Sequence, residues 1–535
     1  MTTLRRVATL FFNLIAACAL HTPATALGQS TETAPVLRES VVETIAPKPD
    51  MPSWFVDAKP SSDVWVALDT LANAASQGLN PQDYRTQALA RGFLQAAENG
   101  APPDTEAQLN ADLSAALEHY LLDMNHGRLS PETLKHRFKA PRTQRFDAYN
   151  YLVQARLSGR LSDALAEAQP KIPMYEAIRS TMLEYQAMSD HPAWNTPLPA
   201  LPARSLKPGE SYEGLELIAA RLAALGDLPE DFVPGERYDN ELVFAVLQFQ
   251  TRHGLEADGL IGPATLEQLN VSPAQRVEQM ALTLERLRWT PLLYGPRMIV
   301  VNVPEFVLRA YEQQGERIEL DLEMRVIVGR ALDTRTPIFL EEMRFIEFSP
   351  YWNVPSSIAR GETLPRLRRD PAYFAQQGFE FVSKDGSVIT TLSGEAIDAV
   401  QRGEWRIRQR PGPSNALGDI KFIFPNDQNI YLHHTPAPQL FSRSRRDFSH
   451  GCIRIEQPVE LASFVLQNQA GWDTARIEQA MSRGTSRTLR LDEPIPVLIT
   501  YSTVVVKDGG KVYFFPDIYQ QDARLNQALR SARPS

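Results

Sequence analysis

The sequence contains only two cysteines, Cys18 and Cys452, in 535 residues, so a fold held together by several disulfides is excluded. Cys18 lies in an apolar N-terminal stretch that is typical of an export signal. If this stretch is removed after Ala26, Cys452 is the single cysteine left, and a single thiol cannot form an internal disulfide. A thiol that persists in an oxidising compartment therefore needs a chemical reason.

The sequence also lacks an excess of positive charge. Its 55 basic residues against 64 acidic ones give a formal charge of −9, which argues against nucleic acid as the main partner. Beyond the N-terminal stretch no apolar run approaches the roughly 20 residues of a spanning helix, so we expect no transmembrane segment in the mature chain. Hydrophobic and charged contents of 43% and 22% are typical of globular protein, and the length predicts two to four domains.

Residues 1–26 have the three parts of a signal peptide: a charged start, an apolar stretch and a small-residue cleavage site at Ala24-Thr25-Ala26. We therefore predict export. The alternative is lipid anchoring at Cys18, because Ile15-Ala16-Ala17-Cys18 resembles the signal of bacterial lipoproteins. Residues 27–50 are rich in Thr, Pro, Glu and Ser without sustained periodicity, and we predict a flexible tether.

The first half of the mature chain has helical periodicity. Leu109, Leu113 and Leu117, for example, recur every fourth residue. Prolines cluster between His191 and Gly209, which is typical of a domain boundary. We predict a helical scaffold at 51–190, a proline-rich linker at 191–210, a small three-helix domain at 211–271 and a helix at 272–295 that returns to the scaffold.

From residue 296 to residue 535 the pattern predicts a β-rich domain. β-branched and aromatic residues gather at Met298–Val303 and Phe306–Tyr311, and a turn of Asp508-Gly509-Gly510 predicts a late hairpin. The strand pattern lapses between residues 356 and 417, where we predict a capping insertion with a helix at 371–377. Its arginines Arg366, Arg368 and Arg369 either form a solvated helix face or bind substrate carboxylates.

The sharpest chemical signal is Ser449-His450-Gly451-Cys452-Ile453-Arg454, with His433-His434 upstream. Only a thiolate is a good nucleophile, and an imidazole within hydrogen-bond reach can take the proton of the thiol. On an extended segment the side chains of His450, Cys452 and Arg454 emerge on one face. His433 and His434 point to opposite faces of their strand, so we expect at most one to line the Cys452 pocket.

Gly451 allows close backbone approach, and N–H groups around Gly451-Cys452 could stabilise an oxyanion. Two other interpretations remain open. Cys452 could be a buried structural residue with incidental histidines. Alternatively, His433 or His434 could form a zinc site together with His450 and Cys452.

The motifs of the last 240 residues resemble the active-site signature of L,D-transpeptidases. The similarity to the large periplasmic subclass of Gram-negative bacteria covers nearly all of the mature chain, and residues 211–271 resemble the peptidoglycan-binding domain type 1. The matching motifs are Ser449 to Arg454 with His433 placed 19 residues before the cysteine, Ile430 to His433, Ser349 to Pro355, Met324 to Gly329 and Asp517 to Tyr519 in the catalytic part, and Phe249-Gln250, Gly254-Leu255, Asp258-Gly259 and Gly262 to Leu266 in the wall-binding part.

The resemblance implies a multidomain α+β protein of the periplasm with a helical scaffold, a small three-helix wall-binding domain and a β-rich catalytic domain with a capping insertion. Cys452 would form a thioester with a peptidoglycan stem tetrapeptide, release D-Ala and pass the acyl group to an acceptor amine in a 3→3 cross-link. Carbapenems would acylate Cys452. No metal or organic cofactor is implied. The expected partners are donor and acceptor stem peptides, with outer-membrane or divisome-associated wall enzymes as further candidates.

The resemblance assigns catalysis to Cys452 with His433 or His450, and we favour His433 as the base. It assigns the active-site loop to Ser449, Gly451 and Arg454, and substrate binding to Trp352, Asn353 and Tyr431. By residue type we add Arg366, Arg368 and Arg369 to the substrate-binding candidates. The sequence departs from the family pattern in one respect. His434 stands where an Asp is expected after the leading histidine, so the orienting role of that acidic side chain must be supplied otherwise or dispensed with.

Overall fold

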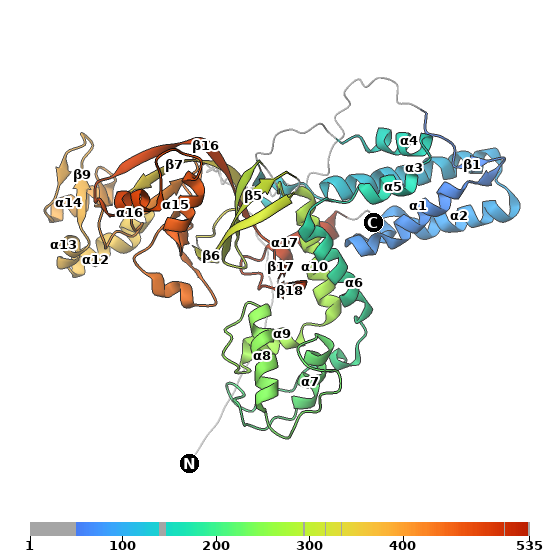
Figure 1. The fold of residues 1–535 in the computed structure, drawn as a ribbon, viewed down its shortest axis with the longest axis horizontal. Coiled ribbons are helices and arrows are strands. Elements are labelled where there is room, and N and C mark those ends of the chain that lie inside the picture. The colour runs from blue at the N-terminus through green and yellow to red at the C-terminus, as the bar shows by residue number, and fades with distance from the viewer. Residues whose placement is uncertain are drawn as a thin grey trace, which may run out of the picture. The chain divides into compact units, whose positions relative to one another are not determined.

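A computed structural model describes residues 50–138, 146–292, 295–315, 317–332, 334–507 and 509–532. The predicted signal peptide and nearly all of the predicted tether lie outside the described residues. Within the described ranges, no helix is long and apolar enough to cross a membrane. The structure is a multidomain α+β protein with helical regions and a β-rich C-terminal region, as the sequence predicts (Figure 1).

Amphipathic helices build the scaffold. They bury Leu113, Leu117 and Leu121 in one core, and the hairpin residues Val504 and Phe514 share that core. The predicted return helix, α10, packs against α6. The scaffold helices are α1 (Ser62–Ala72), α2 (Thr86–Asn99), α3 (Pro103–His126), α4 (Ala148–Leu157), α5 (Leu161–Glu167), α6 (Pro173–Ala187) and α10 (Pro273–Trp289).

A separate core holds three helices, α7 (Leu215–Ala224), α8 (Asn240–Arg252) and α9 (Pro263–Asn270). The amide of Gln250 fixes the turn before α9, because its Oε1 accepts from Gly259 N–H at 2.9 Å. Residues 191–210, predicted as a linker, have little secondary structure but pack onto this core through buried Leu198 and Leu206.

The catalytic region is built on a large sheet with the strand order β12-β13-β15-β6-β5-β4-β16-β7-β3. Because β12 also pairs with β7, the ladder closes on itself. Its interior holds apolar side chains from alternating positions, such as Val326 and Val328 of β6. The strands are β3 (Arg137–Phe138), β4 (Arg297–Asn302), β5 (Val307–Gln314), β6 (Arg317–Gly329), β7 (Phe339–Phe348), β12 (Ile420–Ile423), β13 (Leu432–His433), β14 (Asp447–Ser449, paired with β6), β15 (Ile453–Ile455) and β16 (Arg487–Thr500).

The predicted late hairpin exists and is formed by β17 (Val504–Lys507) and β18 (Lys511–Phe514). The preceding strand, β16, ends at Thr500 and belongs to the large sheet. Three more helices, α15 (Pro458–Leu466), α16 (Thr474–Ser482) and α17 (Gln521–Ser531), complete this region.

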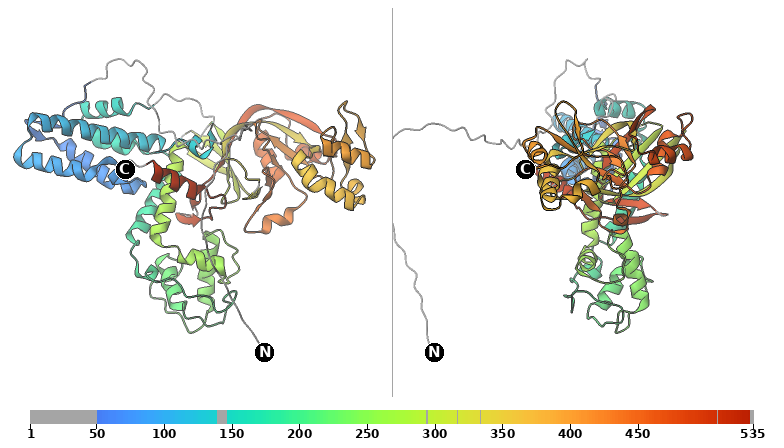
Figure 2. Two further views of the ribbon diagram at one scale, coloured as in Figure 1. Left: turned by 180° about the vertical axis from the view of Figure 1, so that it is seen from behind. Right: turned by 90° about the vertical axis from the view of Figure 1, so that its left-hand side faces the viewer.

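The insertion has its own core and a four-stranded sheet ordered β10-β9-β11-β8. Its helices gather around β9 in Figure 1, and the same grouping is visible in Figure 2. The sequence predicted only one helix here, and strands of two to four residues are too short to give a clear alternating pattern. The elements are β8 (Trp352–Asn353), α11 (Ser356–Ile358), the π-helix η5 (Ala359–Thr363), α12 (Leu364–Arg369), α13 (Ala372–Gln376), β9 (Phe379–Val382), β10 (Val388–Ile389), α14 (Gly394–Arg402) and β11 (Arg406–Gln409).

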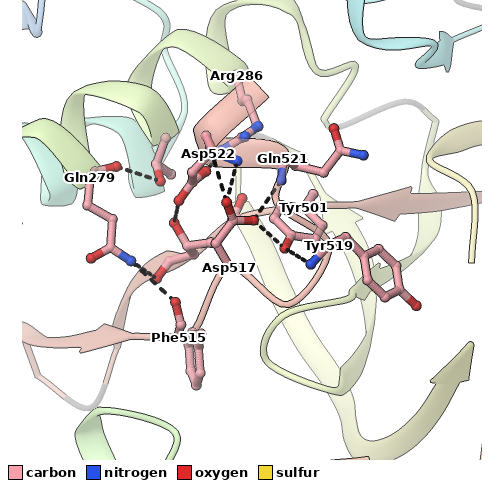
Figure 3. Close-up of polar contacts among 12 residues, drawn as sticks. Gln279, Arg286, Tyr501, Phe515, Asp517, Tyr519, Gln521 and Asp522 are labelled. Atoms are coloured by element: carbon pink, nitrogen blue, oxygen red, sulfur yellow. Dashed lines mark hydrogen bonds and ion pairs between the residues drawn. The ribbon is translucent and has the colours of Figure 1, made fainter. Parts of the chain in front are cut away.

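Asp517 organises the junction between α10, α17 and the end of β16 (Figure 3). One carboxylate oxygen accepts from the Tyr501 hydroxyl at 2.6 Å and the other from the backbone N–H of Asp522 at 2.9 Å. Asp522 in turn forms an ion pair with Arg286 of α10. The Tyr501 hydroxyl also accepts from the Tyr519 N–H at 2.9 Å.

Asp517→Ala is expected to weaken α17 locally by about 1–3 kcal/mol, because the first-turn N–H groups of the helix lose their acceptor. Amide hydrogen exchange of residues 521–523 measures this loss. Asp492→Ala, at an exposed position, is the matched control. Equal protection of α17 in both variants would contradict the assigned role.

Candidate active site

Cys452 lies in a tight turn between β14 and β15. Gly451 takes a φ of +116°, a conformation that residues with a Cβ rarely adopt. The segment is therefore not extended, and the expectation that His450 and Cys452 share one strand face is wrong. The turn sends the two side chains to different surroundings.

Hydrogen bonds hold the turn from inside. The Ser449 hydroxyl accepts from Gly451 N–H at 3.1 Å and donates to the Cys452 carbonyl at 2.5 Å. Thr336 Oγ1 donates to the Gly451 carbonyl at 2.8 Å. The Gly451 N–H is thus already committed, so of the predicted oxyanion pair only the Cys452 N–H remains a candidate donor.

The loop that follows β6 packs against the turn and is hydrogen-bonded to it through Thr336. Gly329 lies so close to this loop that a Cβ there would meet the Thr334 carbonyl at 1.9 Å. Its N–H donates to Thr336 Oγ1 at 2.9 Å, and the Tyr519 hydroxyl donates to its carbonyl at 2.5 Å. Two of the quoted motifs, those containing Gly329 and Tyr519, thus meet beneath the cysteine.

The Cys452 thiol is half-buried, with its Sγ 3.5 Å from the Asn429 carbonyl. Burial raises the pKa of the Cys452 thiol above its ordinary value. Hydrogen bonds from the backbone and side chain of Tyr431 oppose this rise, as do the charges of Lys421 and Arg454. The Lys421 ammonium lies 4.1 Å from the centre of the Tyr431 ring.

His433 is buried on β13, with 4% of its surface exposed. Its Nδ1 lies 2.6 Å from the main-chain carbonyl of His434, which assigns the proton to Nδ1 and leaves Nε2 as the acceptor. This carbonyl does the orienting work for which the sequence suggested an acidic side chain, so the unusual His434 is accommodated. Burial first, and the charges of Arg454 and Lys421 with it, lower the pKa of His433 to about 3.

The other two histidines have different partners. His434 Nδ1 lies 3.4 Å from the Asp419 carboxylate. His450 Nε2 lies 2.7 Å from Oε1 of Glu362 in the π-helix of the insertion. His450 therefore joins the turn that carries Cys452 to the insertion.

Strand register places a row of charges beside the thiol. His433 pairs with Lys421 on β12 and with Arg454 on β15. Lys421 in turn pairs with Glu347 on β7, and the Lys421 ammonium lies 4.0 Å from the Glu347 carboxylate. Directly paired residues share a sheet face, so neutral His433 lies between two cations.

The predicted substrate-binding residues of the insertion contact the insertion itself. Arg366 stacks on Tyr373 at 3.7 Å from the ring centre, Arg368 pairs with Asp398 at 2.9 Å, and Arg369 donates to the Pro365 carbonyl at 3.3 Å. Trp352 and Asn353 pair with β11, and Trp352 packs on the core of the insertion. All of these contacts lie within the insertion.

The zinc alternative requires three histidine and cysteine side chains to converge. Nδ1 of His433 is bonded to a carbonyl, and Nε2 of His450 is bonded to Glu362. Over the described ranges, no group of three or more His, Cys, Asp or Glu side chains could hold a metal ion. The donor geometry therefore does not fit a zinc site.

Sequence reasoning missed Lys421, Asn429, Glu362 and Thr336. Lys421 had a weak signal, a lone charge in the apolar run Ile420-Lys421-Phe422-Ile423. The other three lie in loops or in the insertion, where no periodicity indicates their neighbours. Only the folded chain brings them to the turn.

The arrangement defines a cysteine-centred site in the β-rich domain of a multidomain protein, and family models identify the parts. Residues 296–499 match the L,D-transpeptidase catalytic domain, residues 48–182 a scaffold domain and residues 211–269 a "Putative peptidoglycan binding domain". The chain therefore has the domain architecture of the L,D-transpeptidases that its motifs resemble, which confirms that resemblance.

A Haemophilus influenzae protein named "Putative L,D-transpeptidase" is 34% identical over 255 residues, which are 47% of this chain and 49% of that protein. The chain thus spans about half the length of this relative. An L,D-transpeptidase structure from Stackebrandtia nassauensis has 13% identity, covers 56% of this chain and 97% of its own, and has a TM-score of 0.22. One from Xylanimonas cellulosilytica has 14% identity, coverages of 56% and 100%, and a TM-score of 0.17. TM-scores this low carry no structural argument.

The raised pKa of Cys452 predicts a pH profile. Thiolate becomes abundant only as pH rises toward that pKa, so the rate of alkylation by iodoacetamide should grow about tenfold per pH unit from pH 7 to pH 8 without a plateau. Intact-mass kinetics at several pH values measures this rate. A plateau near neutral pH would indicate a stable thiolate–imidazolium pair instead.

Lys421→Met should slow the alkylation of Cys452 at pH 8, because the Lys421 charge lowers the thiol pKa. Lys511→Met, which removes an exposed charge, is the matched control and should leave the rate unchanged. Equal alkylation rates in both variants would show that the Lys421 charge does not act on the Cys452 thiol.

Proposed function

We propose that this chain is an exported L,D-transpeptidase that forms 3→3 cross-links between peptidoglycan stem peptides through a Cys452 thioester. One observation carries the proposal. The sole thiol of the described residues is held in a braced turn beside Tyr431, within the domain that matches the L,D-transpeptidase catalytic model. The acceptor-capable imidazole of His433 lies on the adjacent strand.

In the acylation step, Sγ of Cys452 attacks the carbonyl carbon of the third stem residue as His433 Nε2 takes the thiol proton. The carbon–nitrogen bond to D-Ala then breaks, and the imidazolium returns the proton to the departing amine. The products are free D-Ala and a thioester on Cys452. The Cys452 N–H is our candidate oxyanion donor, and such a donor is worth about 3–4 kcal/mol in the transition state.

In the second step the amine of an acceptor stem attacks the thioester carbonyl. His433 takes a proton from this amine, the carbon–sulfur bond breaks, and Cys452 is regenerated. Water in place of the amine would give carboxypeptidase activity. Both steps need one group that first accepts and then donates a proton, which the free Nε2 of His433 supplies.

The geometry favours His433 over His450 as the base. Nδ1 of His433 is anchored on a carbonyl, so its Nε2 lone pair is available, whereas Nε2 of His450 is bonded to Glu362. A contact between His450 and the cap fits a positioning role.

The remaining domains fit action at the cell wall. The three-helix domain would hold peptidoglycan near the active site, and the predicted signal peptide would deliver the chain to the periplasm. A zinc peptidase lacks support from the donor geometry. A non-catalytic wall-binding protein remains as the second candidate.

Substitution of the two histidines tests the base. His433→Ala should lower the rate of Cys452 acylation by a carbapenem by about 10²–10⁴-fold, the usual contribution of a general base. His450→Ala should lower it less, because this side chain only positions the turn. Time-resolved intact-mass detection of the adduct measures both rates, and equal or reversed losses would overturn the assignment.

Incubation with purified disaccharide-tetrapeptide tests the reaction. Mass analysis should find free D-Ala and a 3→3 dimer with the wild type, and neither product with Cys452→Ala. Hydrolysis without dimer would point to a carboxypeptidase. No product and no carbapenem adduct would favour the non-catalytic candidate.

A further inference from the structure

The guanidinium of Arg454 has one N–H donor that forms no hydrogen bond within the described residues. It lies on β15, two residues after the nucleophile, between β13 and β6. Its Nε is buried and has no hydrogen-bond partner among the described residues. A buried donor left unpaired costs about 1–3 kcal/mol, which a bound acceptor would recover.

A second cation lies nearby. Burial lowers the pKa of the Arg454 guanidinium and the neighbouring charge of Arg330 adds to this, whereas the charge of Cys452 raises it. Arg330 begins the loop that supports the nucleophile turn, and its N–H donates to the Ser449 carbonyl at 3.0 Å. Its side chain is exposed.

The carboxylates of this region already pair with other cations. Glu347 faces Lys421, Asp447 is held by Arg445 at 2.7 Å, and Glu456 pairs with Arg325. Within the described ranges no carboxylate forms an ion pair with either Arg330 or Arg454. The charges of these two guanidinium groups act on each other, and that of Arg454 also acts on the thiol. With no ion-pair partner among the described residues, the two groups form a candidate site for an anion.

We infer that Arg454, with Arg330 beside it, binds the terminal carboxylate of the D-Ala residue that the reaction releases. The inference rests on the proposed function. In a tetrapeptide donor this carboxylate lies one residue beyond the bond that Cys452 attacks, and a planar guanidinium can hold it through two parallel hydrogen bonds. No other group on the donor combines a fixed negative charge with this closeness to the scissile bond.

The consequence is a specificity rule. A stem that ends at residue four places its carboxylate at the arginines, whereas a stem with a fifth residue places a neutral amide there. The site would thus give a charge-based reason for the tetrapeptide donor that the proposed function already assumes. Leaving the buried arginine unpaired penalises the wrong donor.

The test compares two donors, the disaccharide-tetrapeptide and the same molecule with a C-terminal carboxamide, by the initial rate of release of D-Ala or D-alaninamide. For the wild type, kcat/KM should be about tenfold to a hundredfold higher for the carboxylate, the range expected of a charge-assisted hydrogen bond. In Arg454→Gln this ratio should fall toward one. In Arg330→Gln, an exposed position with less risk to folding, the ratio should also fall.

Arg443→Gln is the matched control, since it removes an exposed arginine from the segment before β14. It should keep the wild-type ratio. The ratio compares two donors on one enzyme, so a general loss of activity through misfolding does not move it. Melting temperature and carbapenem adduct formation verify that each variant is folded.

The outcomes separate the two proposals. If the wild type releases product from neither donor, the proposed function fails. If it processes both donors equally, or if both Gln variants keep the wild-type ratio, the carboxylate site is refuted while the transpeptidase function stands. A ratio lost in the arginine variants and kept in Arg443→Gln supports the site.

Discussion

The candidate active site depends on the hydrogen bonds that Ser449 makes within the turn that carries Cys452. One hydroxyl accepts from Gly451 N–H and donates to the Cys452 carbonyl, which holds Gly451 at a φ of +116°. Only glycine adopts this conformation at low cost. Because of this turn, Cys452 does not follow the in-out alternation of side chains in the flanking strands. Its thiol contacts Tyr431, whereas the side chain of His450 contacts Glu362 of the insertion. Further hydrogen bonds run from the turn through Thr336, Gly329 and Tyr519. They continue from Tyr519 through Tyr501 to Asp517, and thus connect the turn with α17 and α10.

Burial and neighbouring charge act against each other on the thiol. Burial favours the neutral forms of both Cys452 and His433, whereas Lys421 and Arg454 favour the thiolate and disfavour the imidazolium. At neutral pH both groups are therefore neutral, so in the proposed mechanism the proton transfer takes place during the reaction and not in the free protein. A carboxylate bound at Arg454 would offset a charge that depresses the pKa of His433. In that arrangement the donor that fits the site also makes His433 a stronger base.

Motif and periodicity were enough to predict the domain architecture and the β-rich domain that contains Cys452. The strong signals came from long apolar repeats, such as Leu109, Leu113 and Leu117, and from the rare residues around Cys452. Alternation failed at His450 and Cys452, because one glycine dihedral breaks the rule on which it rests. Arg366, Arg368 and Arg369 were assigned to substrate by residue type, yet their partners lie within the insertion. Lys421 and Glu362 could not be predicted, since cross-strand pairing and the insertion bring them to the site over large sequence separations.

His433 and His450, the two histidines of the motif, differ in their hydrogen-bond partners. His433 donates through Nδ1 to a main-chain carbonyl, which any residue at position 434 provides, so its orientation does not depend on an acidic side chain there. The ring of His450 is instead bound by a carboxylate of the cap, 88 residues earlier in the chain. A group anchored on the strand can keep its free nitrogen directed at one place, whereas a group anchored on the insertion follows any movement of the insertion. The proposed proton transfer requires the first property, and the positioning role proposed for His450 agrees with the second.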